Sequence, residues 1–294
     1  RRAAAELEGM LSVHRQAFPP AQPPVAPPPE PVDVRALERK HRRELLRGIG
    51  LLRFSARREA KARARALAEE EAERERARRE AARAEVQRQL DQLWERLCAN
   101  DPGVVLPTLE EALRDNRAPA VAVDCEDGRA TVVVLLEGLD ALPERVPSVT
   151  PTGRPTTRRL TKTERNELYL GWMSSNVLAT VREALAVAPG LAAVTVAVLR
   201  RDGPTPFGEP ALSPVYVGTF GREMCERIAW DRPEALDAIF HAEGASVSLK
   251  GRTKELAPLD PRDHPGLEEL IAEVRRASAD AGDPASLGAR EPRP

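Results

Sequence analysis

Aromatic side chains are scarce in this sequence, with five Phe, three Trp and two Tyr among 294 residues. The hydrophobic fraction of 41% consists mostly of alanine and valine, whereas charged residues make up 31% and prolines number 27. Large side chains supply most of the area that a folded core buries. We therefore expect one modest hydrophobic core rather than two large ones.

Long hydrophobic runs are missing as well. The longest, at 131–136 and 191–199, are far shorter than the roughly 20 residues that a membrane-spanning helix needs. No basic segment followed by an apolar one marks a secretory signal. From these absences we expect no membrane partner and a cytoplasmic location.

Cysteine and histidine are too few and too far apart for the common metal and redox motifs. The three cysteines include no CxxC pair, which favours free thiols in a reducing compartment. The four histidines form no HExxH motif, and GxxxxGKS/T, GxGxxG and GxSxG are all absent. We predict no cofactor and no metal ligands among the residues Cys98, Cys125, Cys225, His14, His41, His241 and His264.

The net charge of −1 conceals a strongly basic segment. Residues 35–68 contain twelve Arg or Lys and three Glu, a net charge of +9, so the other 260 residues carry −10. Such a block is either a solvated helix face or a surface that contacts a polyanion. The candidate polyanion-binding residues are Arg35, Arg39, Lys40, Arg42, Arg43, Arg57, Arg58 and Lys61.

Two helical regions separated by a proline-rich spacer are predicted for the N-terminal third. Apolar residues at helical spacing predict a short amphipathic helix over 3–18, and eight prolines at 19–31 predict an extended spacer. The spacer is a linker, a strap along a helix, or an SH3-type ligand. The proline-free stretch 34–100 predicts one long helix or two, with the bend or break at Gly48 and Gly50.

The charged helix changes character along its length. Between Ala56 and Ala84 almost the only apolar residue is alanine, so we expect no wide hydrophobic face and a projection into solvent. Farther on, a 4-3-4 apolar spacing predicts packing on the following domain or on a partner helix, although it covers fewer than two heptads of a coiled coil. That apolar stripe consists of Val86, Leu90, Leu93 and Leu97.

Strand and helix patterns alternate in the remainder. Two β-rich segments, 120–126 and 129–136, flank an Asp127-Gly128 turn and predict a hairpin. Capping boxes predict two helix starts: Thr108 with Glu111 for a short helix, and Thr161 with Glu164 for a long helix to about Ala188. Further strands are expected at 192–199, 214–219 and 245–249, and further helices from 221, at 233–241 and at 266–279.

These elements predict an α+β fold, with a long N-terminal helical arm followed by a single α/β-sandwich domain. The domain has a β-hairpin, a long covering helix and two or three further strands. The predicted parts are a short helix and Pro-rich spacer at 1–33, a charged helix at 34–100, the α+β domain at 101–260, and a C-terminal helix with a disordered tail at 261–294.

Three groups of side chains are candidates for chemistry. Asp124 and Glu126, two apart on a strand, share a face as a metal-dependent nuclease requires, although acids are also common beside such a turn. The polar run 174–176 in the long helix forms a site or bonds to carbonyls one turn earlier. Cys225 is a reactive thiol if neighbouring arginines lower its pKa, and otherwise a buried structural one.

A proline-rich basic loop precedes the long helix and carries a net charge of +4 over 154–165. Cations and exposed amides that converge at a helix N-terminus suit an anion, whereas the alternative is a mobile solvated loop. The candidate residues there are Arg154, Arg158, Arg159 and Lys162.

Several segments carry a resemblance to a known group of proteins: HRQAFPPAQPPV, ANDPGVVLPTLEEALRDNRAPA, TPTGRPTTRRLTKTERNELY and VREALAVAPGL. With these, the chain resembles a group of actinobacterial proteins in which a basic, alanine-rich helix precedes a conserved α+β domain. The resemblance runs to about Leu259, and related proteins often have a small β-rich domain at the N-terminus. It implies the domain layout and a cytoplasmic origin. No activity is established for the group, so no functional residue is implied.

We predict a non-enzymatic interaction or scaffolding module. Its long helix docks on a protein partner, and its basic part at 35–68 contacts nucleic acid or another polyanion without sequence preference. The alternative is a nuclease-like enzyme in which Asp124 and Glu126 hold a divalent metal. The absence of a lysine or second carboxylate on the adjacent strand favours the interaction module.

Overall fold

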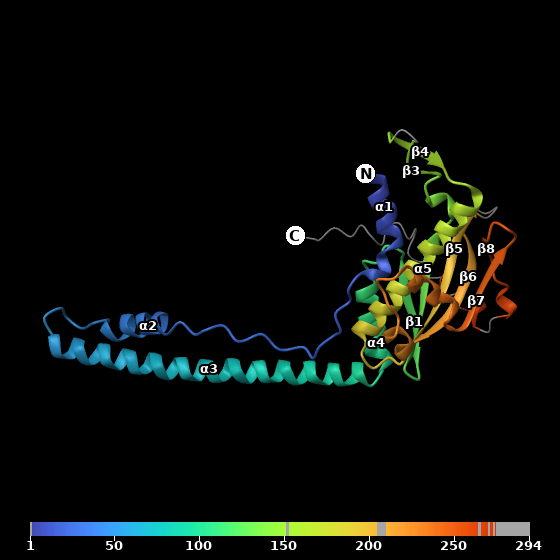
Figure 1. The fold of residues 1–294 in the computed structure, drawn as a ribbon. Helices are drawn as coiled ribbons and strands as arrows, with labels where there is room; N and C mark the ends of the chain where they lie inside the picture. The colour runs from blue at the N-terminus through green and yellow to red at the C-terminus, as the bar shows by residue number, and fades with distance from the viewer. Residues whose placement is uncertain are drawn as a thin grey trace. The chain divides into compact units, whose positions relative to one another are not determined.

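The structure is a computed structural model of the chain (Figure 1). It describes residues 2–150, 153–204, 210–263, 266–269, 271, 272 and 274. The chain divides into two compact units, one of residues 22–95 and one of residues 1–21 together with those from 96 onward. This division differs from the predicted one, because the N-terminal helix belongs to the α+β unit rather than to the spacer.

Residues 22–95 form a helical hairpin. Helix α2 spans Val34–Leu46 and begins at the N-cap Asp33, whose carboxylate accepts a hydrogen bond from the amide of Ala36 at 2.9 Å. Helix α3 spans Phe54–Cys98 and runs alongside α2 in Figure 1. The predicted break is confirmed, since Gly48 has a φ of 91°, which a side chain would disfavour.

The proline-rich segment is a strap along α3. Polyproline II backbone makes no hydrogen bonds of its own, so its carbonyls and amides need outside partners. Gln87 of α3 accepts from the amide of Ala26 at 2.8 Å and donates to the carbonyl of Pro24 at 3.1 Å. One helical turn apart, Arg83 donates to Ala26 and Arg79 to the carbonyl of Glu30. Of the predicted alternatives, the structure shows the strap.

Alanine makes the buried face of α3. Ala64, Ala68 and Ala72 recur every four residues and are fully buried. Glu71, beside them, accepts from Lys40 of α2 at 3.1 Å and lies 2.5 Å from His41 Nε2, and these two bonds lower the pKa of its carboxyl. The hydrophobic face is therefore narrow, as predicted, but α2 covers it.

The apolar stripe near the end of α3 is only partly packed. Leu97 is 8% exposed, whereas Val86 and Leu93 are 45% and 46% exposed. Val86 and Leu93 are not buried within residues 22–95, so their predicted packing, on the following domain or on a partner helix, stays a prediction. In the sequence the four positions look equivalent, because spacing does not reveal where along a helix a partner begins.

A six-stranded sheet forms the centre of the other unit, and the predicted α+β class is confirmed. Its strand order is β1-β2-β5-β6-β7-β8, with β2 and β5 parallel and the other pairs antiparallel. The strands are β1 Ala120–Glu126, β2 Arg129–Glu137, β5 Ala193–Pro204, β6 Pro210–Gly221, β7 Glu243–Lys250 and β8 Glu255–Ala257. The predicted hairpin turn is confirmed, with positive φ at Asp127 and Gly128.

Both faces of the sheet are covered. Helix α5, Lys162–Val187, connects the parallel strands β2 and β5 and begins at the predicted Thr161/Glu164 capping box. On the opposite face, Val133 and Leu199 pack with Leu267 and Ile271 of the C-terminal segment. Burial on both faces explains why the central strands consist of almost continuous Val, Ala and Leu.

The helix that follows α3 begins earlier than predicted. Helix α4 spans 102–113, and the carboxylate of its N-cap Asp101 accepts from the amide of Gly103 at 2.9 Å. The hydroxyl of Thr108 instead donates to the carbonyl of Val104 at 2.7 Å, inside the helix. The capping box predicted at Thr108 is therefore wrong, because a threonine within a helix bonds backward to the preceding turn.

Other elements also differ from the prediction. The basic loop before α5 contains a hairpin of β3 and β4, and the helix expected at 233–241 is a 3-10 helix. The predicted helix at 266–279 is described only in part, and the tail from 275 lies outside the described residues. The remaining elements are β3 Arg145–Val149, β4 Pro155–Arg159, α6 Arg222–Glu226, η2 Leu139–Ala141, η3 Pro233–Phe240 and η4 Pro261–Asp263.

The N-terminal segment is fixed to α5. It consists of α1, Arg2–Leu11, and η1, Val13–Arg15. The side chain of His14 is 1% exposed, and its Nδ1 lies 3.0 Å from the hydroxyl of Ser175. Arg182 of α5 donates to the carbonyl of His14. The predicted helix over 3–18 is therefore confirmed to Leu11, after which a 3-10 turn places His14 in the core.

Acid is expected to loosen this attachment. Burial, and then the cations Arg15 and Arg182, lower the pKa of His14 below 6.5. The unfolded chain therefore gains a proton at pH values where the folded chain does not, so stability present above pH 6.5 is lost as the pH falls. We expect the Tm to drop between about pH 7.5 and about pH 5.5, and to drop less in His14→Gln.

The exposed His241 provides the control for this measurement. His241→Gln removes an exposed imidazole and leaves the buried His14 in place. The Tm of this variant should therefore depend on pH as the wild-type Tm does. An equal acid-induced drop in Tm for wild type and His14→Gln would show that His14 does not contribute.

Candidate functional site

The end of the hairpin where α2 turns into α3 is the candidate functional site; we call residues 42–65 the basic end. The chain reverses through two consecutive turns. The amide of Ile49 donates to the carbonyl of Leu46 at 3.2 Å, and the amide of Arg53 donates to that of Gly50 at 3.2 Å. Arg57 of α3 donates to the carbonyl of Ile49 at 3.1 Å and so fixes the loop to the helix.

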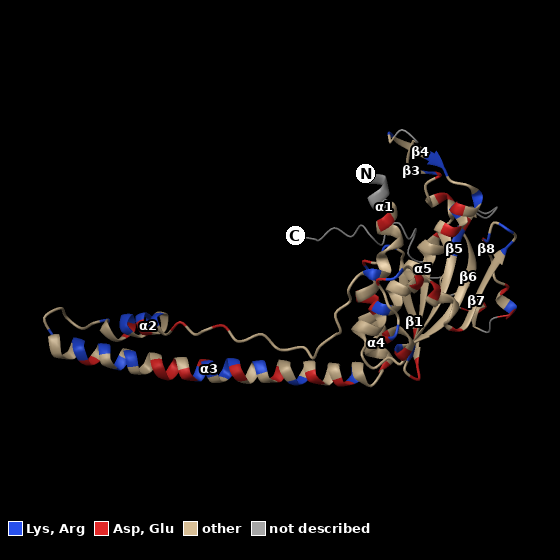
Figure 2. Ribbon diagram, in the orientation of Figure 1, with Lys and Arg blue, Asp and Glu red and all other residues tan. Residues whose placement is uncertain are grey.

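Most cations of the basic end lack a partner of opposite charge. Arg65 pairs with Glu69 at 3.0 Å, and Arg57 is committed to the loop carbonyl. The other cations make no ion pair with any carboxylate in the described part of the chain, and all are exposed. They are Arg42, Arg43, Arg47, Arg53, Arg58, Lys61 and Arg63. Figure 2 shows the basic residues gathered over α2 and the first turns of α3, with acids farther along α3.

The structure separates the residues that the sequence grouped together. Arg42, Arg43, Arg58 and Lys61 lie at the basic end and are exposed. Toward the start of α2, Arg39 pairs with Asp33 at 3.7 Å and Lys40 with Glu71 at 3.1 Å, while Arg35 is exposed. The positive field is therefore strongest at the loop end of the hairpin, since cations paired with carboxylates contribute little to it.

Sequence reasoning missed a second property of this end. Leu51 and Leu52 occupy the two central positions of the turn from Gly50 to Arg53 and are 78% and 85% exposed, and Phe54 is 75% exposed. Central turn positions usually hold Gly, Asn, Asp or Ser. We call these three side chains the apolar apex. The signal in the sequence was two leucines inside a segment already predicted to break the helix.

The predicted anion site before α5 is occupied by a carboxylate of the chain itself. Arg158 of β4 binds both oxygens of Glu164, at 2.6 and 2.8 Å, and Glu164 also accepts from the amide of Thr161 at 2.9 Å. These bonds lower the pKa of Glu164 to about 2. Because the N-terminus of α5 already holds this charge, it offers little to an external anion.

Two of the other three candidate cations of this region also form ion pairs within the chain. Arg159 pairs with Glu144 at 3.5 Å and Lys162 with Glu255 at 2.6 Å. Arg154 is exposed, and its backbone amide donates to the Thr150 hydroxyl at 3.0 Å. The net charge of +4 therefore does not form an unpaired cluster.

The candidate nuclease carboxylates are exposed on β1, an edge strand. Asp124 accepts a hydrogen bond from the amide of Cys125 at 2.8 Å, and Glu126 lies opposite Arg129 across the hairpin. Among the described residues, no group of three His, Cys, Asp or Glu side chains is arranged to hold a metal. The pair thus has the environment of turn-flanking acids and lacks the further ligands that a nuclease metal uses.

The polar run in α5 is satisfied within the fold. The hydroxyl of Ser174 donates to the carbonyl of Leu170, and the side-chain amide of Asn176 donates to the carbonyl of Trp172, both at 2.8 Å. These are the backward bonds expected of polar residues in a helix. Ser175 differs, because its hydroxyl accepts from the amide of His14 at 3.2 Å and holds the N-terminal segment.

The thiol of Cys225 is buried, and burial raises its pKa to about 11. A thiol that stays protonated at neutral pH is a poor nucleophile. The nearby Arg222 lowers the pKa but is engaged elsewhere, since its guanidinium donates to the carbonyls of Leu185, Ala188, Pro189 and Leu191. Arg222 therefore satisfies the carbonyls at the C-terminal end of α5.

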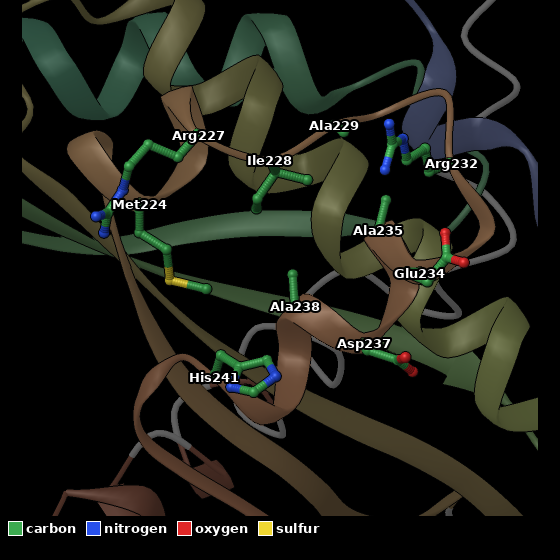
Figure 3. A pocket seen from close by; sticks show the side chains of 10 residues that line it. All are labelled: Met224, Arg227, Ile228, Ala229, Arg232, Glu234, Ala235, Asp237, Ala238 and His241. Carbon is green, nitrogen blue, oxygen red and sulfur yellow. The ribbon is translucent and has the colours of Figure 1, made fainter.

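A hollow of about 510 Å³ lies between α6 and η3 (Figure 3). Met224, Ile228 and Ala238 supply its apolar lining, and Glu234 and Asp237 lie at one side. Among the described residues that line it, none is a thiol or hydroxyl nucleophile, and none belongs to a metal-binding group. The groups that line it with charge are Arg227, Arg232, Glu234 and Asp237, and no described observation links them to a reaction.

Comparison with known proteins adds no relative. Neither the protein-family models, nor the curated proteins, nor the solved structures match this chain. Among the described residues, none of the helices combines the length and the apolar character that crossing a bilayer requires.

Proposed function

We propose that this protein is a non-enzymatic interaction module and that the basic end of the hairpin binds a phosphate-bearing polyanion. The observation that supports this function best is the set of exposed cations without carboxylate partners, gathered where two helices meet at one loop. Each such cation replaces a condensed counterion when it contacts a phosphate, and the released ions drive the binding.

The contact is expected to be independent of nucleotide sequence. Specific readout needs side chains that reach base edges from a groove, and single-strand binding needs several aromatic platforms. Phe54 is the only aromatic residue of the basic end. Nucleic acid would therefore be held through its backbone.

A protein partner is proposed for the remainder of α3. The half-exposed side chains of Val86 and Leu93 lie one helical turn apart from Leu90 on the same stripe. An apolar stripe of this length suits a short helix of another protein better than a long coiled coil. The nuclease alternative has no observation in its favour, given the surroundings of Asp124 and Glu126.

The affinity for random-sequence duplex DNA should depend steeply on salt. If the basic end neutralises about four to six phosphates, the association constant falls by roughly two to three decades between about 50 mM and about 200 mM salt. Fluorescence anisotropy of a labelled duplex measures this slope. A duplex of unrelated sequence should give the same affinity, and absence of binding below about 10 μM at the lower salt would contradict the proposed function.

A further inference from the structure

The apolar apex distinguishes the basic end from a surface built for nucleic acid alone. Leu51, Leu52 and Phe54 leave most of their side-chain area in water. The hydrogen bond from Arg53 to Gly50 and the one from Arg57 to Ile49 define the conformation that exposes them. The folded loop itself therefore presents apolar side chains outward.

Cations lie directly beside and behind this apex. Arg53 stands between Leu52 and Phe54, Arg47 precedes the loop, and Arg58 and Lys61 follow in the first two turns of α3. All four are exposed and make no ion pair with any carboxylate that the structure describes. An apolar tip with a basic collar matches the interface of an anionic bilayer, where acyl chains lie just beneath a layer of phosphates.

We propose that the basic end docks on anionic phospholipid surfaces, with the apolar apex inserted at the depth of the headgroup–acyl boundary. This inference rests on the proposed function, since it names the phosphate-bearing surface that the same cations bind. A duplex presents phosphates and sugars to an approaching loop and gives the two leucines no apolar partner. A bilayer provides partners for both the cations and the leucines.

The inference departs from the sequence-based expectation of no membrane partner. That expectation depended on the absence of an apolar run long enough to span a bilayer. A loop that reaches only the headgroup boundary needs a few exposed apolar residues and basic neighbours. The structure shows that combination at residues 47–61.

The test is cosedimentation of the full-length chain with vesicles, one set of pure phosphatidylcholine and one containing roughly one-third phosphatidylserine. We expect binding to the phosphatidylserine vesicles only. In L51S/L52S the partition coefficient for these vesicles should fall at least about tenfold, because serine gains no free energy from the apolar environment that the two leucines enter. The same variant should bind duplex DNA as wild type does, since all cations remain.

The matched control is V25S/V149S, which removes two exposed apolar side chains from other places, 75% and 66% exposed. It should bind phosphatidylserine vesicles as wild type does. Because all four replaced side chains are exposed, we expect both variants to stay folded, and a measurement of their Tm verifies this.

The outcomes separate this inference from the proposed function. Duplex binding without vesicle binding, or vesicle binding unchanged in L51S/L52S, overturns the lipid inference and leaves polyanion binding in place. Loss of duplex binding in L51S/L52S would show that the leucines act as a wedge on nucleic acid and would likewise overturn it. If neither duplex nor vesicles bind wild type, both proposals are wrong.

Discussion

Replacing Gly190 with alanine is expected to destabilise the α+β unit by about 1–3 kcal/mol. Gly190 follows α5, and its carbonyl accepts from the side chain of Asn100 at 2.8 Å. A Cβ at Gly190 would overlap the carbonyl oxygen of Cys98 and lie 2.8 Å from Asn100 Oδ1. Because a backbone carbonyl cannot rotate away as a flexible side chain can, the turn after α5 must separate from the end of α3.

Thermal unfolding measures this effect. For a domain of this size the expected loss corresponds to a fall in Tm of roughly 2–10 °C. Gly203→Ala is the control, because Gly203 is exposed and an added Cβ there meets no atom of the described residues within 4 Å. Equal Tm values for the two variants would contradict the close contact between Gly190 and Cys98.

Reversing two charges at the basic end should lower the affinity for duplex DNA by about 10- to 100-fold at low salt and reduce the salt slope by about two. The variant R58E/K61E suits this test, because both side chains are exposed on α3 and lack a carboxylate partner among the described residues. Glutamate is a good helix former and is favoured near a helix N-terminus, so α3 should remain folded. Arg57 is unsuitable, since it holds the loop through Ile49.

The matched control is K250E/R252E, which reverses one lysine and one arginine at exposed positions of the other unit. Both variants change the net charge by the same amount, so a nonspecific effect of net charge would weaken binding equally. Anisotropy titrations of the two variants decide the matter. Equal loss of affinity would show that overall charge, rather than the basic end, governs the interaction.

Local sequence signals predicted the elements whose ends depend on nearby residues. The Asp127-Gly128 turn and the Thr161/Glu164 capping box are both present, because a hairpin turn and a helix N-terminus are set by a few adjacent side chains. Gly48 ends α2 for the same reason. The Thr108 capping pattern failed because Asp101, with Pro102 after it, begins the helix earlier.

Tertiary contacts could not be predicted from one sequence. The strap on α3 depends on Arg79, Arg83 and Gln87 reaching backbone groups about 50–60 residues away, and no local pattern marks them. Burial of Ala64, Ala68 and Ala72 likewise requires knowing that α2 returns along α3.

The candidate site was predicted in part. Charge counting located the basic segment, but it could not distinguish Lys40, paired with Glu71, from Lys61, which has no such partner among the described residues. It also combined Arg158 with that set, although Arg158 is bound to Glu164. Ion pairs form between side chains that folding brings together, so the structure shows them and the sequence does not.

Hydrogen–deuterium exchange of the full-length chain, with and without random-sequence duplex at low salt, tests most directly whether the basic end is the contact surface. The account predicts slower exchange at the loop 47–54 and the first turns of α3, where loop amides exposed to water become covered. It predicts no change at 145–159 or at the hollow of 224–241. Slower exchange confined to either of those regions, with none at 47–65, would contradict it.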